Sequence, residues 1–368
     1  MKVLMIEHYL PDSIYSLELG QELKKHCDLS ILCRANGRED EKGIRWLPYL
    51  YQGGEGKIKA AFEYGISLLR TASVIKKGKY DVVHIQTFKN AKLEMGIYRR
   101  YRKDFGKLVH TVHNALPHEA SAEDLRLYGA FYDFCDELIV HNETSAKYLE
   151  QNFRISAAKI TVIPHGAYQT HLNRGKKRET GGIKHFLQFG VIRRYKGIDI
   201  LLDAIALIPA EKRKNMRFTI AGKQFKKLDP TDYEKKIRDQ GLEEYVRFSG
   251  DFVPEEDIPG LFGNADFVLF PYRSIYGSGA LMMAYTYDKP VVASDIPTFA
   301  EETENGRTGI LFESENPQAL ADALIRAYEC SEEQVREYGA SICNLIAEKY
   351  NWKRSAEKTA EVYRKKCY

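Results

Sequence analysis

Histidines follow several short apolar runs of this sequence, at the positions where strands would end. The segments are His84-Ile-Gln-Thr, His110-Thr-Val-His113 and Pro164-His165-Gly166. A histidine at a strand end can donate a hydrogen bond or move a proton near neutral pH, and packing in the core is the alternative role for each. His110 and His113 could form a metal pair, but no cysteine or third ligand of suitable spacing follows them. We therefore expect no metal site.

Phosphate binding is indicated between residues 189 and 197. The segment Phe189-Gly190-Val-Ile-Arg193-Arg194-Tyr-Lys196-Gly197 lies between an apolar run and a helical pattern. Gly190 lets the backbone turn and approach a ligand, Arg193 and Lys196 bring positive charge, and the next helix points its first amides at the same place. The alternative is an exposed basic cluster with an ordinary turn glycine.

A glycine-serine turn is the second phosphate candidate. Between Pro271 and Ala284 an apolar run passes through Gly277-Ser278-Gly279-Ala280 into a helical pattern, whose free amides could hold the other phosphate of a diphosphate. The sequence has no G-x-G-x-x-G after its first apolar run, no G-x-x-x-x-G-K-[ST], no G-x-S-x-G and no Asp-x-Asp. These absences argue against dinucleotide oxidoreductases, P-loop nucleotide hydrolases, α/β-hydrolases and a metal-held nucleotide.

Two series of strand-like runs must position these residues. The first comprises Lys2 to Ile6, Leu29 to Cys33, Val82 to Ile85, Leu108 to Val112, Glu137 to His141 and Lys159 to Ile163. The second comprises Phe186 to Phe189, Arg217 to Ala221, Val246 to Ser249, Phe267 to Phe270, Val291 to Ala293 and Gly309 to Phe312. Helix-length segments separate the runs, which predicts two parallel sheets with helices on both faces. Ligands of such sheets bind at the carboxyl ends of the strands, where the candidate residues lie.

The length of 368 residues also favours two domains. We predict a first α/β domain over residues 1–170, a linker within Tyr168 to Gly182, a second α/β domain over 183–348 and a terminal helix over 349–368. Six cysteines are scattered without a C-x-x-C pair, and no window reaches the ~18 uncharged apolar residues of a spanning helix. We expect a cytoplasmic protein that meets a membrane only at its surface. The net charge of +4 argues against dedicated nucleic-acid binding.

Taken in order, these motifs resemble the GT-B glycosyltransferases of family 4. The motifs are Phe189 to Gly197, Ile163-Pro-His-Gly166, Tyr285 to Asp295 followed by Glu301 and Asn305-Gly-Arg-Thr-Gly309, and Tyr350-Asn-Trp352. The resemblance covers the whole chain. It implies two Rossmann-like α/β/α domains that face a central cleft, with a C-terminal helix that crosses back to the first domain. It also implies transfer of a sugar from a UDP- or GDP-sugar with retention of configuration, without a cofactor or a metal.

The resemblance also assigns roles to residues. Arg193 and Lys196 match the pair that holds the donor diphosphate, and His113 matches the strand-end histidine that faces the transferred sugar; these three form the predicted catalytic set. The predicted substrate-binding set is Gly190, Ser278, Gly279, Ala280, Glu301 and His165. The family's E-x7-E glutamates fall at Ile275 and Met283, so the chain looks like a branch that lacks them.

A basic stretch of the first domain suggests where an acceptor would be found. Residues 57 to 107 hold thirteen basic and four acidic side chains, a net charge of +9, with aromatic and aliphatic residues between them. Such helices can lie on anionic lipid, and solvated outer helices are the alternative. The predicted patch is Lys76, Lys77, Arg99, Arg100, Arg102 and Lys103. Because the family's acceptor side is the first domain, we expect a glycan acceptor, lipid-linked, in the synthesis of a cell-surface polysaccharide or glycolipid.

Two other functions stay open. The missing glutamates favour a sugar-nucleotide-binding protein without transferase activity. A GT-B nucleotide-sugar epimerase is the other alternative, although it would want carboxylates near the sugar, where Ile275 and Met283 stand.

Overall fold

The computed structural model describes residues 1–10, 13–34, 43–51, 53, 56–117, 120–168 and 182–365. The chain divides into two compact units: unit 1 holds Met1–Gly166 and Lys349–Tyr368, and unit 2 holds Ala167–Glu348. The end of the chain therefore belongs with its beginning, as the expected crossover helix requires. Most of the predicted linker, residues 169–181, lies outside the described residues.

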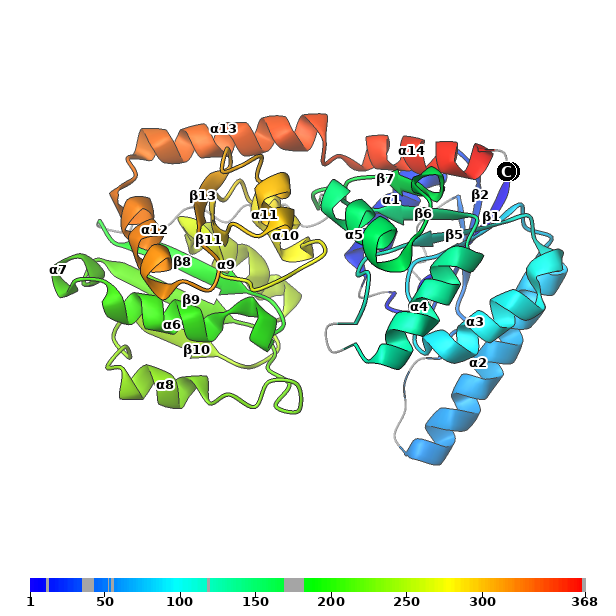
Figure 1. The fold of residues 1–368 in the computed structure, drawn as a ribbon, viewed down its shortest axis with the longest axis horizontal. Helices are drawn as coiled ribbons and strands as arrows, with labels where there is room; N and C mark the ends of the chain where they lie inside the picture. Colours follow the sequence, from blue (N-terminus) through cyan, green and yellow to red (C-terminus); the bar gives the residue numbers. More distant parts are fainter. Residues whose placement is uncertain are drawn as a thin grey trace. The chain divides into compact units, whose positions relative to one another are not determined.

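Unit 1 contains a seven-stranded parallel sheet (Figure 1). The strands are β1 (Lys2–Ile6), β2 (Asp28–Leu32), β3 (Ile44–Leu47), β4 (Val82–Ile85), β5 (Lys107–Thr111), β6 (Glu137–Val140) and β7 (Ile160–Val162), in the order β3-β2-β1-β4-β5-β6-β7. The helices are α1 (Ile14–Leu23), α2 (Lys57–Gly78), α3 (Ala91–Arg100), α4 (Ala122–Phe134), α5 (Glu143–Phe153) and α14 (Trp352–Arg364). Short 3₁₀ turns precede β5 and β7, at Arg102–Asp104 and Ala157–Lys159.

Unit 2 contains a six-stranded parallel sheet. Its strands are β8 (Lys184–Phe189), β9 (Met216–Ala221), β10 (Val246–Ser249), β11 (Phe267–Phe270), β12 (Val291–Ser294) and β13 (Gly309–Phe312), in the order β10-β9-β8-β11-β12-β13. Its α-helices are α6 (Ile198–Leu207), α7 (Ala210–Arg213), α8 (Tyr233–Asp239), α9 (Ile258–Asn264), α10 (Gly279–Thr286), α11 (Pro297–Glu302), α12 (Pro317–Glu329) and α13 (Glu332–Glu348). Two 3₁₀ turns, at Arg194–Lys196 and Glu255–Asp257, precede α6 and α9. The prediction of two α/β units with parallel sheets is confirmed.

The strand order marks one position in each sheet where a ligand is expected to bind. In unit 1 the order reverses at β1, which lies between β2 and β4; in unit 2 it reverses at β8, which lies between β9 and β11. The loops that leave neighbouring strands at such a point run to opposite faces of the sheet and leave a crevice at the carboxyl ends. The crevice of unit 2 is bordered by the segment after β8, which contains Lys196, and by the segment after β11, which begins at Pro271.

The terminal helix α14 packs on unit 1 through its buried face. Asn351 caps the helix by accepting a hydrogen bond from the Arg354 amide at 2.9 Å. Ser355 Oγ donates to the carbonyl of Pro164 at 2.9 Å, and the Trp352 ring covers Gly166 so closely that a Cβ there would lie 2.5 Å from it. The α14 helix therefore presses on the segment that follows β7.

Candidate functional site

Lys196 is the buried cation of the unit 2 crevice. Its side chain lies on the 3₁₀ turn after β8, is only 6% exposed, and has Nζ 3.4 Å from the carbonyl of Phe189 and 5.4 Å above the centre of the Tyr272 ring. Burial, with a smaller effect from Arg193, lowers the pKa of Lys196 to about 7. No carboxylate of the described residues pairs with Lys196, and an anionic ligand there would favour the charged form of the lysine.

Two neighbouring polar atoms strengthen this assignment. The Gln188 side chain donates to the Lys196 carbonyl at 3.0 Å, and its own oxygen is buried. The Tyr272 hydroxyl is buried as well. Neither the Gln188 oxygen nor the Tyr272 hydroxyl has a hydrogen-bond partner within the described ranges. Buried polar atoms of this kind are expected at a site that a ligand or water completes.

The position of Lys196 depends on two contacts with the segment after β11. Gly197 has φ +65°, and a Cβ on it would overlap the carbonyl oxygen of Pro271. Arg273 holds Asp199 in the first turn of α6 with two hydrogen bonds of 3.0 and 2.7 Å. Sequence reasoning missed Arg273, although it lies within the segment that was predicted to hold phosphate.

The predicted phosphate amides lie at the start of α10. Ser278 is buried and caps this helix, accepting a hydrogen bond from the Leu281 amide at 3.1 Å. The amides of Gly279 and Ala280 have no hydrogen-bond partner in the described part of the chain. A Cβ on Gly279 would lie 3.0 Å from the Tyr168 hydroxyl, so the backbone there is closely approached. The amides stay predicted phosphate donors.

Glu301 lies on α11, after β12, and is partly exposed. Strands β8, β11 and β12 are neighbours in the sheet, so the segments that carry Lys196, Gly279 and Glu301 leave the same edge side by side. This shared edge is what the structure adds to the predicted set; the individual roles stay predictions.

In unit 1, His113 has both ring nitrogens in contact with protein atoms. Its Nε2 lies 3.0 Å from Gln86 Oε1, and its Nδ1 lies 3.2 Å from His141 Nε2. The Tyr15 and His113 rings form a T-shaped pair with 4.6 Å between their centres. Burial, together with the neighbouring histidines, holds the pKa of His113 well below its usual range. Its imidazole is therefore neutral near pH 7.

His165 belongs to the same cluster. Its Nδ1 donates to the Gly166 carbonyl at 2.7 Å, and its ring lies 5.5 Å from that of His141 and 5.4 Å from that of Trp352. Burial lowers its pKa to about 3. Gln86 and His141 were not predicted as site residues, although each stands at a strand end, which is the signal that selected His113.

His110 is directed elsewhere. Its Nδ1 donates to the Ile85 carbonyl at 2.9 Å, and its ring packs against Phe131 and Tyr132. It is a core histidine, so the structure does not bring His110 and His113 together as a pair. No group of three or more metal-ligating side chains capable of holding an ion occurs among the described residues.

Glu7 organises the loops after β1 and β4. Its carboxylate is fully buried and accepts hydrogen bonds from the Tyr9 amide at 2.9 Å, Ser16 Oγ at 2.6 Å and Thr87 Oγ1 at 2.5 Å. The predicted run Lys2 to Ile6 ends just before it, but a single glutamate there carries no recognisable signal. Glu7 therefore links the segments after β1 and β4 at the point where the strand order reverses.

The predicted basic patch is only partly available. Lys76, Lys77, Arg100 and Lys103 are exposed. Arg102 instead holds Asp136 with hydrogen bonds of 3.0 and 2.7 Å, and Arg99 donates to the Ala130 carbonyl at 3.3 Å. Arg102 therefore stabilises unit 1 through its ion pair with Asp136.

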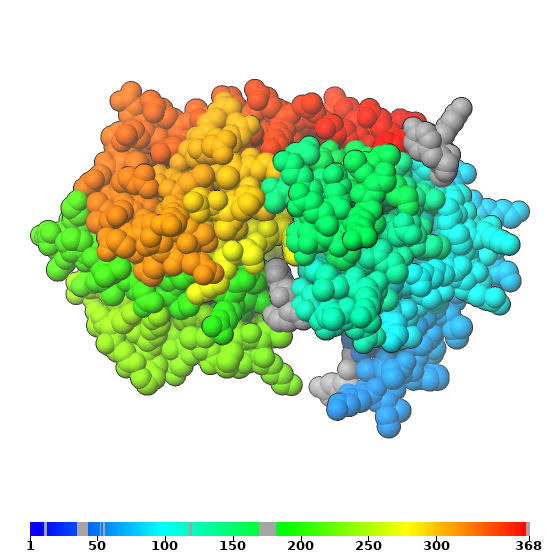
Figure 2. Space-filling model, in the orientation of Figure 1, coloured from blue at the N-terminus to red at the C-terminus, as the bar shows by residue number. Residues whose placement is uncertain are grey.

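Large apolar side chains are exposed on the same helices. Ile58 is 89% exposed, Phe62 69% and Leu69 72%, and all three lie on one face of α2. Figure 2 shows the first part of α2, in blue, standing out from unit 1. No helix in the described ranges is both long and apolar enough to span a bilayer.

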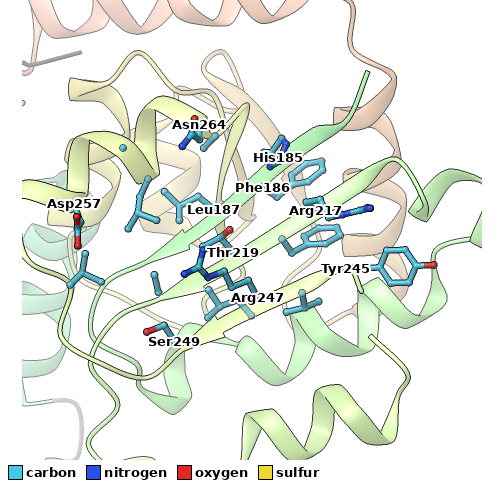
Figure 3. Close-up of a pocket in the computed structure, with 18 of the residues that line it drawn as sticks. His185, Phe186, Leu187, Arg217, Thr219, Tyr245, Arg247, Ser249, Asp257 and Asn264 are labelled. Atoms are coloured by element: carbon cyan, nitrogen blue, oxygen red, sulfur yellow. The ribbon is translucent and has the colours of Figure 1, made fainter. Parts of the chain in front are cut away.

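A pocket of about 810 Å³ lies in another part of unit 2 (Figure 3). It covers the face of β8, β9 and β10 that carries Leu187, Thr219 and Arg247, next to the seven-residue helix α9. The other face of these strands is covered by the core that includes α6 and α8. None of the predicted site residues lines this pocket, so we do not assign the donor to it.

Comparison with known proteins agrees with the geometry of both units. Residues 13–168 match the family described as Glycosyltransferase Family 4, and residues 183–330 match Glycosyl transferases group 1. The D-inositol 3-phosphate glycosyltransferase of Paenarthrobacter aurescens is 29% identical over 243 residues, which are 63% of this chain and 58% of that protein. The chain thus matches a little over half the length of this relative.

Solved structures with the same fold include two that match nearly the whole chain. Sucrose-phosphate synthase from Thermosynechococcus elongatus has a TM-score of 0.77 at 18% identity, covering 98% of each chain. Anabaena HepE in complex with UDP-glucose has a TM-score of 0.76 at 19% identity, again covering 98% of each. These likenesses show the GT-B fold. With its two family matches, the chain belongs to the family 4 glycosyltransferases.

Proposed function

We propose that this protein transfers a sugar from a UDP- or GDP-sugar to a glycan acceptor in the synthesis of a cell-surface polysaccharide or glycolipid. The observation that carries the proposal is Lys196, a buried ammonium in the crevice where the strand order of unit 2 reverses. The UDP-glucose bound by HepE and the phosphorylated acceptor in the name of the inositol phosphate relative support this chemistry.

The donor diphosphate would be neutralised by protein groups. Lys196 and Arg193 supply positive charge, and the amides of Gly279 and Ala280 supply hydrogen-bond donors at the start of α10. Charge that develops on the leaving diphosphate is stabilised by such preorganised donors. We propose that the reaction needs neither a metal nor a cofactor, so excess EDTA should leave its rate unchanged.

The step that we propose retains configuration at the anomeric carbon. The bond from that carbon to the diphosphate oxygen breaks, a bond to the acceptor oxygen forms on the same face, and the leaving diphosphate takes the acceptor proton. No side-chain base is then required. This agrees with His113, because both of its ring nitrogens already contact other side chains of unit 1.

The experiment is a transfer assay with a panel of labelled UDP- and GDP-sugars and a membrane extract as acceptor source. We expect label to move from one donor of the panel into glycan or lipid, with release of the nucleoside diphosphate. Binding of a donor without turnover in any extract would contradict the proposal in favour of a sugar-nucleotide-binding protein.

We propose further that α2 and α3 place the acceptor side of the protein on an anionic membrane, on its cytoplasmic face. Ile58, Phe62 and Leu69 form an exposed apolar stripe, and exposed lysines such as Lys76 and Lys77 lie on the same helix. An interfacial helix combines these two features, and each basic residue near anionic lipid contributes about 1 kcal/mol.

Vesicle co-sedimentation tests this part. We expect binding to phosphatidylglycerol vesicles at low salt, weakened by Phe62→Ser and by the pair Lys76→Glu and Lys77→Glu. The matched control is Lys226→Glu with Lys227→Glu, which makes the same charge change at exposed positions of unit 2. Equal loss in both double variants would show only a net-charge effect and would contradict a docking surface on α2.

A further inference from the structure

A chain of hydrogen-bonding side chains crosses unit 1 from α14 to the segment after β7. It begins at the Tyr363 hydroxyl, 2.6 Å from His84 Nδ1. His84 Nε2 lies 3.2 Å from the Gln86 amide, and the other end of that amide lies 3.0 Å from His113 Nε2. His113 Nδ1 is 3.2 Å from His141 Nε2, and His141 Nδ1 is 3.0 Å from the Ile163 carbonyl.

The Ile163 end of the chain fixes one proton. A carbonyl only accepts hydrogen bonds, so His141 must carry its proton on Nδ1. Neutral His141 then has only a lone pair on Nε2. To fill the contact of 3.2 Å, His113 must donate to it from Nδ1.

The Tyr363 end fixes another proton independently. Among the described residues the Tyr363 hydroxyl has His84 Nδ1 as its sole hydrogen-bond partner, so it donates there. Neutral His84 then carries its proton on Nε2, which faces Thr111 Oγ1 at 2.8 Å and the Gln86 amide at 3.2 Å. Thr111 Oγ1 can accept from this N–H, and the Gln86 oxygen is the end of the amide that suits the same contact, because an NH₂ group there would face another donor.

A half-turn of the Gln86 amide exchanges its oxygen and nitrogen, which are alike in shape, and the hydrogen-bond network decides between them. With its oxygen toward His84, Gln86 presents its NH₂ group to His113 Nε2. His113 Nε2 must then carry a lone pair rather than a proton, and the His113 proton must be on Nδ1. The Ile163 end thus requires this form of His113, and the Tyr363 end is consistent with it.

We propose that unit 1 holds His113 as the neutral tautomer with its proton on Nδ1, and that Gln86 is the positioning residue that keeps it so. This inference rests on the proposed transferase function for its role in catalysis. His113 then offers a substrate one group, the Nε2 lone pair, once a sugar hydroxyl replaces the Gln86 amide. It is an acceptor of a hydrogen bond and cannot donate a proton from that nitrogen.

The opposite orientation of Gln86 would need an extra proton. His113 Nε2 would then donate to the Gln86 oxygen, and the contact with His141 would hold no proton unless one ring became an imidazolium. Among the described residues, the groups that face His113 are the rings of His141, His165 and Tyr15, together with Gln86. None of these described groups is an anion that would stabilise the added charge.

Histidine tautomers are measured directly by ¹⁵N NMR of the imidazole nitrogens, without any ligand or assay. With His113 assigned from the spectrum of His113→Asn, we expect its Nδ1 to be protonated and its Nε2 unprotonated at pH 7.5. The Nε2–H tautomer, or an imidazolium at that pH, would overturn the proposal. This result needs only the wild-type fold.

Gln86→Glu tests the positioning role. A carboxylate accepts only, so His113 must carry a proton on Nε2 as well as on Nδ1, and its pKa should rise by about 1–3 units. The matched control is Gln224→Glu, a buried glutamine of unit 2 whose NH₂ donates to two carbonyls. A His113 titration in Gln86→Glu that equals the wild type would overturn the proposal. These spectra do not depend on sugar transfer, so failure of the proposed function would leave them unchanged.

Discussion

The ammonium of Lys196 lies 2.8 Å from the point where a Cβ on Gly190 would stand. Gly190 has φ +106° and donates from its amide to the Ala221 carbonyl at 3.0 Å, so its backbone is held in a conformation that other residues rarely adopt. Glycine at 190 is therefore what allows the buried ammonium to reach the crevice at the end of β8.

Gly190→Ala should damage both folding and binding. The strained φ and the contact with Lys196 should lower the free energy of unfolding by about 1–3 kcal/mol. Displacement of the ammonium should weaken binding of the donor that the sugar-nucleotide panel identifies at least about tenfold, which corresponds to about 1.4 kcal/mol. Urea unfolding and calorimetry measure the two effects. The control is Gly241→Ala, which also has positive φ but open space around it; equal loss of affinity in both variants would refute a specific role for Gly190.

Binding of the donor that the UDP- and GDP-sugar panel identifies should weaken as the pH rises above about 7. In the free protein burial lowers the pKa of Lys196 to about 7, and a bound diphosphate raises it, because the anion favours the ammonium. Below pH 7 the lysine is charged in both the free and the donor-bound protein. Above pH 7 the free lysine is neutral, so binding must take up a proton, and affinity falls by up to about tenfold per pH unit. Calorimetry in buffers of different ionisation enthalpy measures that uptake. Lys196→Arg should abolish it, because arginine stays charged; uptake that persists in this variant would assign it to another group.

Gly166→Ala should loosen the terminal helix. A Cβ at residue 166 would lie 2.5 Å from the Trp352 ring, which packs against Tyr15 and His165. Overpacking of this kind costs about 1–3 kcal/mol. Hydrogen exchange should show faster exchange in α14. Gly96→Ala on α3 meets open space and should be neutral or stabilising, so equal destabilisation by the two changes would contradict the packing argument.

Arg273→Ala should release the turn that carries Lys196. Although burial alone would raise it, the pKa of Asp199 is lowered by hydrogen bonds from Arg273. A depressed carboxyl pKa stabilises the fold above the unfolded pKa of about 4, and this contribution is lost as the pH falls through the folded value. The variant should therefore lose stability at pH 7 and depend less on pH between about 5 and 3. Thermal melts over that range measure the change, and an unchanged profile would show that the pair contributes nothing.

The positions of the strands were largely predictable, because buried parallel strands are short apolar runs. The edge strand β3 was missed, since only the two end residues of Ile44–Leu47 are buried and the exposed Arg45 interrupts the apolar run. The run Lys159 to Ile163 proved to be a shorter strand after a 3₁₀ turn. In both places local structure differs from the apolar pattern because the chain is turning at the edge of a sheet.

Side-chain parity along a strand, which the sequence analysis did not use, accounts for how the histidines of unit 1 are arranged. His110 and His113 are three residues apart, so an extended chain directs them to opposite faces, and the structure shows His110 in the core. His84 and Gln86 are two apart and share a face, which explains their contact. The partner Tyr363 lies 279 residues from His84, and no local pattern connects them.

The role of Lys196 is tested most directly by comparing sugar transfer by the wild type, Lys196→Ala and the control Lys226→Ala, with the same labelled donor panel and membrane extract. We expect transfer from one donor by the wild type and the control. For Lys196→Ala we expect a rate about 10²–10³-fold lower, because a preorganised donor to a developing negative charge is removed. Equal rates for Lys196→Ala and the wild type would contradict the claim that Lys196 holds the donor diphosphate.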